Sequence, residues 1–113
     1  MPKNPSYDRW VVRGGARLAG EVTVTGAKNS VLKLLAATLL APGRSVLTNV
    51  PDIADVRIMG ELLRSLGAQL HHDAEAGVVT VDVPELVGDV ADYDLVRRIR
   101  GSFVVLGPLL ARR

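Results

Sequence analysis

The 113-residue sequence contains no cysteine, which excludes disulfide bonds, thiolate metal sites and a cysteine nucleophile within these residues. Aromatic residues make up only 4%, and proteins that bind single-stranded nucleic acid usually stack the bases on aromatic side chains. Charged residues, glycine or proline interrupt every apolar run well before it reaches the length of a membrane span. The polar N-terminus, residues 1–10, lacks the apolar region of a signal peptide. We therefore expect a soluble cytoplasmic protein with no nucleic-acid or membrane partner.

The sequence is instead rich in aliphatic residues, and hydrophobic residues make up 48% of it. A core built from leucine, valine, isoleucine and alanine suits helices packed on a sheet. The formal net charge of +2 gives a weakly cationic surface, which suits a small anion as well as a polyanion. His71 and His72 lie on a predicted strand, so their side chains point to opposite faces and do not chelate one metal. Because no other spacing typical of a metal or cofactor site occurs, neither is expected.

Alternation and helical periodicity divide the chain into short elements. Residues 1–8 are expected to form a frayed lead-in. Strands are predicted at residues 10–13, 21–25, 45–48, 68–73 and 78–83, and the last two form a hairpin. Helices are predicted at residues 29–41, at residues 54–66 and from residue 93 onward. The order β-β-α-β-α-β-β-α predicts an α/β unit with helices on one side of a small sheet.

Three finer expectations concern the helices. The first helix is apolar nearly all the way round, so it should be buried on most sides. Asp52 or Asp55 should cap the second helix, and Gly67 is well placed to end it. The pair Gly107-Pro108 should kink or end the third helix.

The strongest local feature is Gly26-Ala27-Lys28-Asn29-Ser30, between a predicted strand and a predicted helix. A helix N-terminus has free N–H groups and about half a positive charge, and Lys28 adds a full charge there. Asn29 and Ser30 have short side chains that can cap the helix or donate to a ligand. This combination suits a phosphate or a carboxylate. From spacing alone, a turn glycine, a solvated lysine and a capping asparagine explain the segment slightly better.

A second feature is the run of arginines at residues 97, 98 and 100 on the third predicted helix. Arg97 and Arg100 are i,i+3 neighbours, so they should share a face. Arg100 precedes two small residues that permit the close approach of a ligand, and its guanidinium suits fork-like contact with a phosphate or carboxylate. A solvated basic helix face is the better explanation for Arg97 and Arg98.

A series of short phrases runs along nearly the whole chain, from about Trp10 to Arg112. The phrases are Leu18-Ala19-Gly20-Glu21-Val22, Thr25-Gly26-Ala27-Lys28-Asn29, Leu35-Ala36-Ala37-Thr38-Leu39-Leu40, Asn49-Val50-Pro51-Asp52-Ile53, Asp55-Val56, Leu62-Leu63-Arg64-Ser65-Leu66-Gly67-Ala68, Tyr93-Asp94-Leu95-Val96, Ile99-Arg100-Gly101-Ser102 and Leu106-Gly107-Pro108-Leu109-Leu110-Ala111-Arg112. Each phrase alone is unspecific, but their order and spacing are highly specific. Together they resemble the N-terminal part of the UDP-N-acetylglucosamine 1-carboxyvinyltransferase family of enolpyruvyl transferases.

The resemblance implies an α/β fold, the two-domain inverted α/β barrel built from β-α-β-α-β-β units, of which this chain holds one in an incomplete barrel. Residues 1–27 would be N-terminal strands that pack on the second domain, and residues 28–113 would be the first, truncated part of the transferase domain. The implied reaction transfers the enolpyruvyl group of phosphoenolpyruvate to the 3-hydroxyl of UDP-N-acetylglucosamine and releases phosphate. It is the first committed step of peptidoglycan synthesis and needs no cofactor.

The resemblance also implies roles for individual residues. Lys28 and Asn29 would contact phosphoenolpyruvate, and Lys28 would be catalytic because it stabilises charge on the phosphate and carboxylate. Arg100 would face UDP-N-acetylglucosamine, and Asp55 would lie near the site. Two departures occur: Lys33 stands where the family often has proline, and Gly101 stands where alanine is common, which should loosen the helix slightly.

The family's proton donor, a cysteine or aspartate on a mobile loop, lies beyond the residues that this chain matches. We therefore expect the chain alone to be a truncated, inactive piece with apolar surface that favours self-association. One alternative is the related enzyme that acts on shikimate 3-phosphate, whose turn is of the Gly-Ser-Lys-Ser type. The segments at residues 26–29 and 49–51 favour the sugar-nucleotide enzyme. The other alternative is a non-catalytic fragment that only binds anions.

Overall fold

Valines alternate with other residues in the segment Val78-Val79-Thr80-Val81-Asp82-Val83, a pattern that buries one face of a strand. In the computed structural model, which describes residues 9–112, this segment is strand β3 (Val78–Val83), and Val79, Val81 and Val83 are buried. β3 pairs antiparallel with β1 (Gly43–Leu47) and with β2 (Gln69–Asp73), so the sheet order is β1-β3-β2. The predicted hairpin is confirmed. Residues 1–8 and 113 lie outside the described residues.

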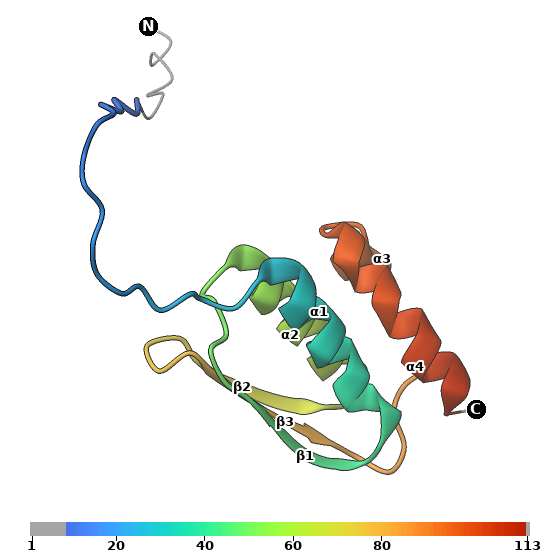
Figure 1. Ribbon diagram of the computed structural model, residues 1–113. Helices are drawn as coiled ribbons and strands as arrows, with labels where there is room; N and C mark the ends of the chain where they lie inside the picture. The colour runs from blue at the N-terminus through green and yellow to red at the C-terminus, as the bar shows by residue number, and fades with distance from the viewer. Residues whose placement is uncertain (1–8, 113) are drawn as a thin grey trace, which may run out of the picture.

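Two helices cover one face of this sheet (Figure 1). They are α1 (Lys28–Ala37), which continues as the short helix η1 (Thr38–Leu40), and α2 (Ala54–Ser65). The apolar stripe of α2, residues 56, 59, 63 and 66, is buried, whereas Arg57, Glu61 and Arg64 face solvent. The predicted arrangement of helices on one side of a small sheet is therefore confirmed. Gly67, with φ of +104°, ends α2 as predicted.

Two expectations about these helices are wrong. Leu34 and Leu40 are 56% and 53% exposed, because the sheet and α2 cover only one side of α1. Neither Asp52 nor Asp55 caps α2, because the residue before the helix is Ile53 and no side chain accepts a hydrogen bond there. Asp52 instead accepts a 2.6 Å hydrogen bond from Arg57.

The third predicted helix is broken into α3 (Tyr93–Val96), η2 (Arg100–Val105) and α4 (Leu106–Ala111). The break falls at Ile99, which is extended (φ −140°, ψ 137°), and not at Gly107-Pro108 as expected. Pro108 lies in the first turn of α4, and the chain is helical on both sides of it. The single hydroxyl hydrogen of Ser102 is shared between the carbonyls of Val96 and Ile99, which both lie 2.6 Å from Oγ, and so bridges the break. No helix within residues 9–112 is long and apolar enough to cross a bilayer.

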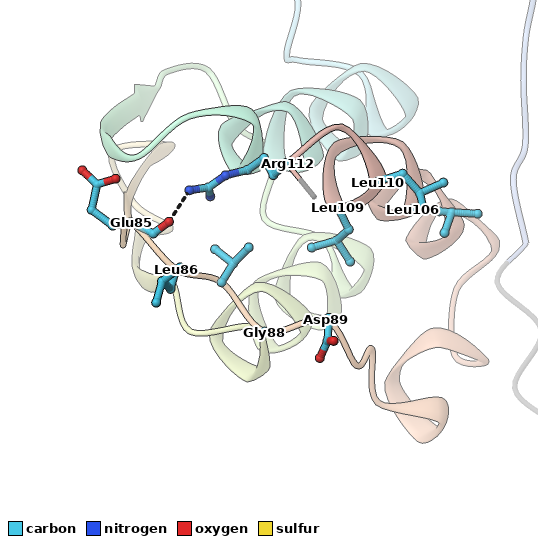
Figure 2. Close-up of a pocket in the computed structure, with 9 residues that line it drawn as sticks. Glu85, Leu86, Gly88, Asp89, Leu106, Leu109, Leu110 and Arg112 are labelled. Atoms are coloured by element: carbon cyan, nitrogen blue, oxygen red, sulfur yellow. Dashed lines mark hydrogen bonds between the residues drawn. The ribbon is translucent and has the colours of Figure 1, made fainter.

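The sheet and the helices that pack with it, residues 26–112, form the body of the structure. Arg112 fixes the end of α4 to the rest of this body. Its guanidinium donates to the carbonyls of Leu39 (3.2 Å), Pro84 (3.4 Å) and Glu85 (2.7 Å), and Figure 2 shows the bond to Glu85. These bonds join α4 to η1 and to the chain that leaves β3.

A charged pair reinforces the edge of the sheet. Arg44 on β1 lies opposite Asp82 on β3 and donates two hydrogen bonds to its carboxylate, at 2.9 and 3.1 Å. Hydrogen bonding from Arg44 lowers the pKa of Asp82. Because the folded pKa lies below the unfolded one, this contribution to stability is present at neutral pH and is lost as the pH falls through the folded pKa.

Residues 9–25 form an extended arm that leads away from this body (Figure 1). Neither predicted strand in it, at residues 10–13 and 21–25, is formed, and Trp10 and Val22 are 88% and 90% exposed. The physical reason is that no strand of the described residues lies beside the arm to accept its backbone hydrogen bonds. The α/β class is therefore confirmed, but the first strand of the expected β-α-β-α-β-β unit is absent.

The arm joins the body through a close backbone contact. A Cβ atom at Gly26 would collide with the carbonyl oxygen of Asn49, so only glycine fits there. Asn49 has φ of +55° and donates from Nδ2 to the carbonyl of Val24 at 3.2 Å. The turn after β1 thus fixes where α1 begins.

Replacing Gly26 with alanine should therefore destabilise the fold by about 1–3 kcal/mol, because the new methyl group meets a backbone atom. Urea denaturation followed by circular dichroism measures the change. Gly14→Ala is the matched control, because an added Cβ there meets no atom within 4 Å. Equal unfolding free energies for the two variants would contradict the contact.

Adjacent leucines of α1 test the position of the core. Leu35 is fully buried and Leu34 is 56% exposed. Leu35→Ala should lower the free energy of unfolding by about 2–5 kcal/mol, whereas Leu34→Ala should change it by less than about 0.5 kcal/mol. The same denaturation experiment compares them, and a larger loss at Leu34 would mean that α1 is rotated relative to the sheet.

Candidate active site

Helix α1 begins at Lys28, immediately after the Gly26 contact. The residue before it, Ala27, is extended (φ −81°, ψ 141°), and no side chain accepts a hydrogen bond from the first turn. The expectation that Asn29 or Ser30 caps this helix is therefore wrong. The first helical bond is Val31 N–H to the carbonyl of Ala27 (3.0 Å). The backbone N–H groups of residues 28–30 thus have no acceptor among the described residues, which leaves the positive end of the helix open.

Lys28 makes an ion pair with a residue from the next helix. Its Nζ lies 3.5 Å from Oδ2 of Asp55, and the two side chains are 57% and 28% exposed. Asp55 is in the first turn of α2, so the N-termini of the two helices lie side by side. The sequence placed Asp55 near the site only through the resemblance, and the pairing itself was not predicted.

Arg100 comes from a third element. It is the first residue of η2 and is exposed, and no acidic side chain within residues 9–112 lies in ion-pair distance of it. The next residue, Gly101, lies against α1: a Cβ there would be 2.5 Å from Cδ1 of Leu32. Because Leu32 is one turn along α1 from Lys28, η2 begins close to the start of α1.

The other two arginines of the run have partners. Arg97 pairs with Asp94 (3.1 Å) and lies over the ring of Tyr93, 5.8 Å from its centre. Arg98 pairs with Glu61 of α2 at 3.3 Å. The break at Ile99 puts Arg97 and Arg100 on different helices, so the shared face expected from i,i+3 spacing is wrong. Arg97 and Arg98 behave as the solvated basic residues expected from the sequence.

The structure thus brings Lys28, Asn29 and Asp55 to two neighbouring helix N-termini, with Arg100 on an element packed against the same helix. The positive charge of two cationic side chains and a set of free N–H groups exceeds the negative charge of one carboxylate. This balance suits an anion such as a phosphate or carboxylate. His71 is exposed and His72 half-buried, consistent with opposite faces, and no cluster of three or more metal-ligating side chains occurs among residues 9–112.

Concave surface lies elsewhere. A hollow of about 100 Å³ beside the first turn of α1 is lined by Ser30 and Leu34 among others, and Lys28 is not among its lining residues. A groove of about 400 Å³ runs between residues 85–89 and α4 (Figure 2), and it includes neither Lys28 nor Asp55. The candidate site is therefore an open surface, with one wall supplied by α1, α2 and η2.

Comparison with known proteins gives the family. A family profile described as EPSP synthase (3-phosphoshikimate 1-carboxyvinyltransferase) matches residues 12–113. Proteins named UDP-N-acetylglucosamine 1-carboxyvinyltransferase match 93% of this chain, with 56% identity in Mycobacterium leprae, 54% in Mycobacterium tuberculosis and 52% in Corynebacterium jeikeium. The chain spans about a quarter of their length, because the match covers 25% of each.

A solved structure agrees with these relatives. The enolpyruvyl transferase NikO from Streptomyces tendae matches 88% of this chain, over 23% of its own length, with 36% identity and a TM-score of 0.74. The resemblance noted from the sequence phrases is confirmed. The chain belongs to the EPSP synthase family of carboxyvinyl (enolpyruvyl) transferases.

Proposed function

We propose that this chain supplies one wall of the active site of an enzyme that transfers the enolpyruvyl group from phosphoenolpyruvate to the 3-hydroxyl of UDP-N-acetylglucosamine. Phosphate is released, and the reaction is an early cytoplasmic step of peptidoglycan synthesis. The observation that carries the proposal is Lys28 at the uncapped N-terminus of α1. Relatives of 52–56% identity that carry the name of this activity support it.

Phosphoenolpyruvate presents a phosphate and a carboxylate, and both need cationic or N–H donors. Lys28 is assigned as the catalytic residue that stabilises the charge on these groups as the substrate reacts. Asn29, whose side chain is exposed beside it, is assigned as a second contact to phosphoenolpyruvate. The free N–H groups of the first turn add donors that need no reorganisation when the anion binds.

Arg100 is assigned to UDP-N-acetylglucosamine. Its guanidinium is exposed and free of acidic partners within the described part of the chain, so it is available to the diphosphate or another acceptor of the nucleotide sugar. Its position on η2, which packs against α1 at Leu32, supports a sugar-nucleotide site beside that for phosphoenolpyruvate.

The choice of acceptor rests on the relatives. The matching profile is described by the shikimate 3-phosphate enzyme, whereas the relatives described above carry the name of the sugar-nucleotide enzyme. The segment Gly26-Ala27-Lys28-Asn29 also differs from the Gly-Ser-Lys-Ser turn of the shikimate enzyme. We therefore assign UDP-N-acetylglucosamine as the acceptor.

The arm completes the proposal. Apolar side chains at residues 10–12, 18, 22 and 24 are exposed on it. We assign residues 1–27, of which 1–8 lie outside the described residues, as a segment that forms strands only once it packs on a second domain, and residues 28–113 as the first part of the transferase domain. In a solution of the chain alone, this apolar surface is expected to cause self-association.

A hybrid enzyme tests the activity. The 113-residue chain would replace the matching quarter of the Mycobacterium tuberculosis relative, to which it is 54% identical. The hybrid should release phosphate from phosphoenolpyruvate with UDP-N-acetylglucosamine and not with shikimate 3-phosphate, and the isolated chain should be inactive with both. Lys28→Ala should lower kcat/KM by about 10²–10³-fold, the usual cost of removing one donor to developing charge.

Lys33→Ala is the matched control, because Lys33 is an exposed lysine on the same helix and its loss should leave kcat/KM within about twofold. Turnover with shikimate 3-phosphate would reassign the acceptor. Equal activity of the two lysine variants would remove Lys28 from the site. Turnover by the isolated chain would show that the residues of this chain alone are sufficient for catalysis.

Arg100 has its own kinetic test in the same hybrid. Arg100→Ala should raise KM for UDP-N-acetylglucosamine by about 10- to 100-fold, the size expected for a lost charged hydrogen bond, and should leave KM for phosphoenolpyruvate nearly unchanged. Arg97→Ala, which removes an arginine already paired with Asp94, should change neither constant. A larger effect at Arg97 would contradict the assignment.

A further inference from the structure

We propose that Asp55 is a positioning residue, which holds the ammonium group of Lys28 at the N-terminus of α1 before phosphoenolpyruvate binds. The inference rests on the proposed function, because it concerns how the catalytic lysine is presented to its substrate. It goes further by giving a role to a carboxylate that an anion site would otherwise be better without.

The carboxylate of Asp55 is in the first turn of α2, where it complements the positive end of the helix, and it remains available to Lys28. It does not cap α2, and its partner within the described residues is Lys28 Nζ at 3.5 Å. The position of Asp55 is well fixed, since the following turn of α2 is anchored in the core by Val56 and Met59, both at most 2% exposed. A fixed carboxylate therefore faces a flexible lysine.

A lysine side chain needs a fixed partner of this kind to hold its ammonium group in one place. The side chain has four rotatable bonds and loses much rotamer freedom when it is held in one geometry. An exposed ion pair of this kind adds little to the stability of a fold. It does restrict the ammonium group in advance, which lowers the ordering cost when the anion arrives. The ammonium has three N–H donors, so a contact with Asp55 leaves two for phosphoenolpyruvate.

A neighbouring ion pair provides a matched comparison. Asp52 lies three residues earlier and accepts a shorter hydrogen bond, 2.6 Å, from Arg57. That pair joins the residue two before α2 to the first turn of α2 and does not reach α1. If a carboxylate mattered here only for local folding or for net charge, loss of Asp52 and loss of Asp55 would have similar effects. A positioning role predicts that only Asp55 matters for phosphoenolpyruvate.

The test uses the hybrid enzyme and a double-mutant cycle. Asp55→Asn should raise KM for phosphoenolpyruvate by about tenfold, as expected when a reacting group is misplaced, with KM for UDP-N-acetylglucosamine unchanged. Asp55→Glu keeps the carboxylate, so its KM for phosphoenolpyruvate should return most of the way to the parent value. Asp52→Asn should have a KM for phosphoenolpyruvate within about twofold of the parent. In the Lys28→Ala background, Asp55→Asn should cause no further rise in KM for phosphoenolpyruvate, because the two residues act as one unit.

Thermal melts of every variant show whether it is folded, and Asp55→Glu keeps the test valid if Asp55→Asn is unstable. Three results would overturn the positioning role. The first is an unchanged or lower KM for phosphoenolpyruvate in Asp55→Asn, and the second is an equal rise in KM for both substrates. The third is a full additional rise in KM for phosphoenolpyruvate when Asp55→Asn is added to Lys28→Ala. If the parent hybrid is active and Lys28→Ala is impaired, these results reject only the role of Asp55. If Lys28→Ala is unimpaired, the proposed phosphoenolpyruvate site fails and the inference fails with it.

Discussion

The packing of α1 and α2 on one face of β3 determines where Lys28 and Asp55 of the candidate site lie. Leu35 from α1, Met59 from α2 and Val81 from β3 are buried in one apolar cluster. Both helices start at the same end of this layer (Figure 1), so burial of their apolar faces brings their first turns together. The Lys28–Asp55 ion pair is a consequence of that packing and not its cause, because exposed pairs contribute little stability.

Local patterns predicted the elements that depend on local chemistry. Alternation in residues 78–83, the stripe of α2 and the turn glycine Gly67 each gave a correct element, because period and turn conformation are properties of a few neighbouring residues. The strand at residues 21–25 failed although its alternation is clear, since a strand also needs a neighbour. The break at Ile99 was missed because the packing of Gly101 against Leu32 of α1 is a tertiary contact, which a local pattern does not show.

The candidate site likewise combines features set by neighbouring residues with features set by tertiary contacts. Lys28 could be predicted, because a lysine after Gly-Ala at a helix start is visible in the sequence. Its pairing with Asp55 could not, since the two residues are joined only by the packing of two helices. The sequence placed Arg97 and Arg100 on one face of a single helix, but it already favoured a solvated role for Arg97 and a ligand contact for Arg100. The structure puts the two arginines on either side of a break at Ile99, pairs Arg97 with Asp94 and leaves Arg100 exposed.

The central claim is that phosphoenolpyruvate binds at the N-terminus of α1, and a crystal structure of the hybrid enzyme with phosphoenolpyruvate bound tests it most directly. The account predicts a phosphate or carboxylate oxygen within hydrogen-bonding distance of Lys28 Nζ, with Asn29 also in contact and Asp55 still beside the lysine. Phosphoenolpyruvate bound away from α1, for example in the groove between residues 85–89 and α4, would contradict it.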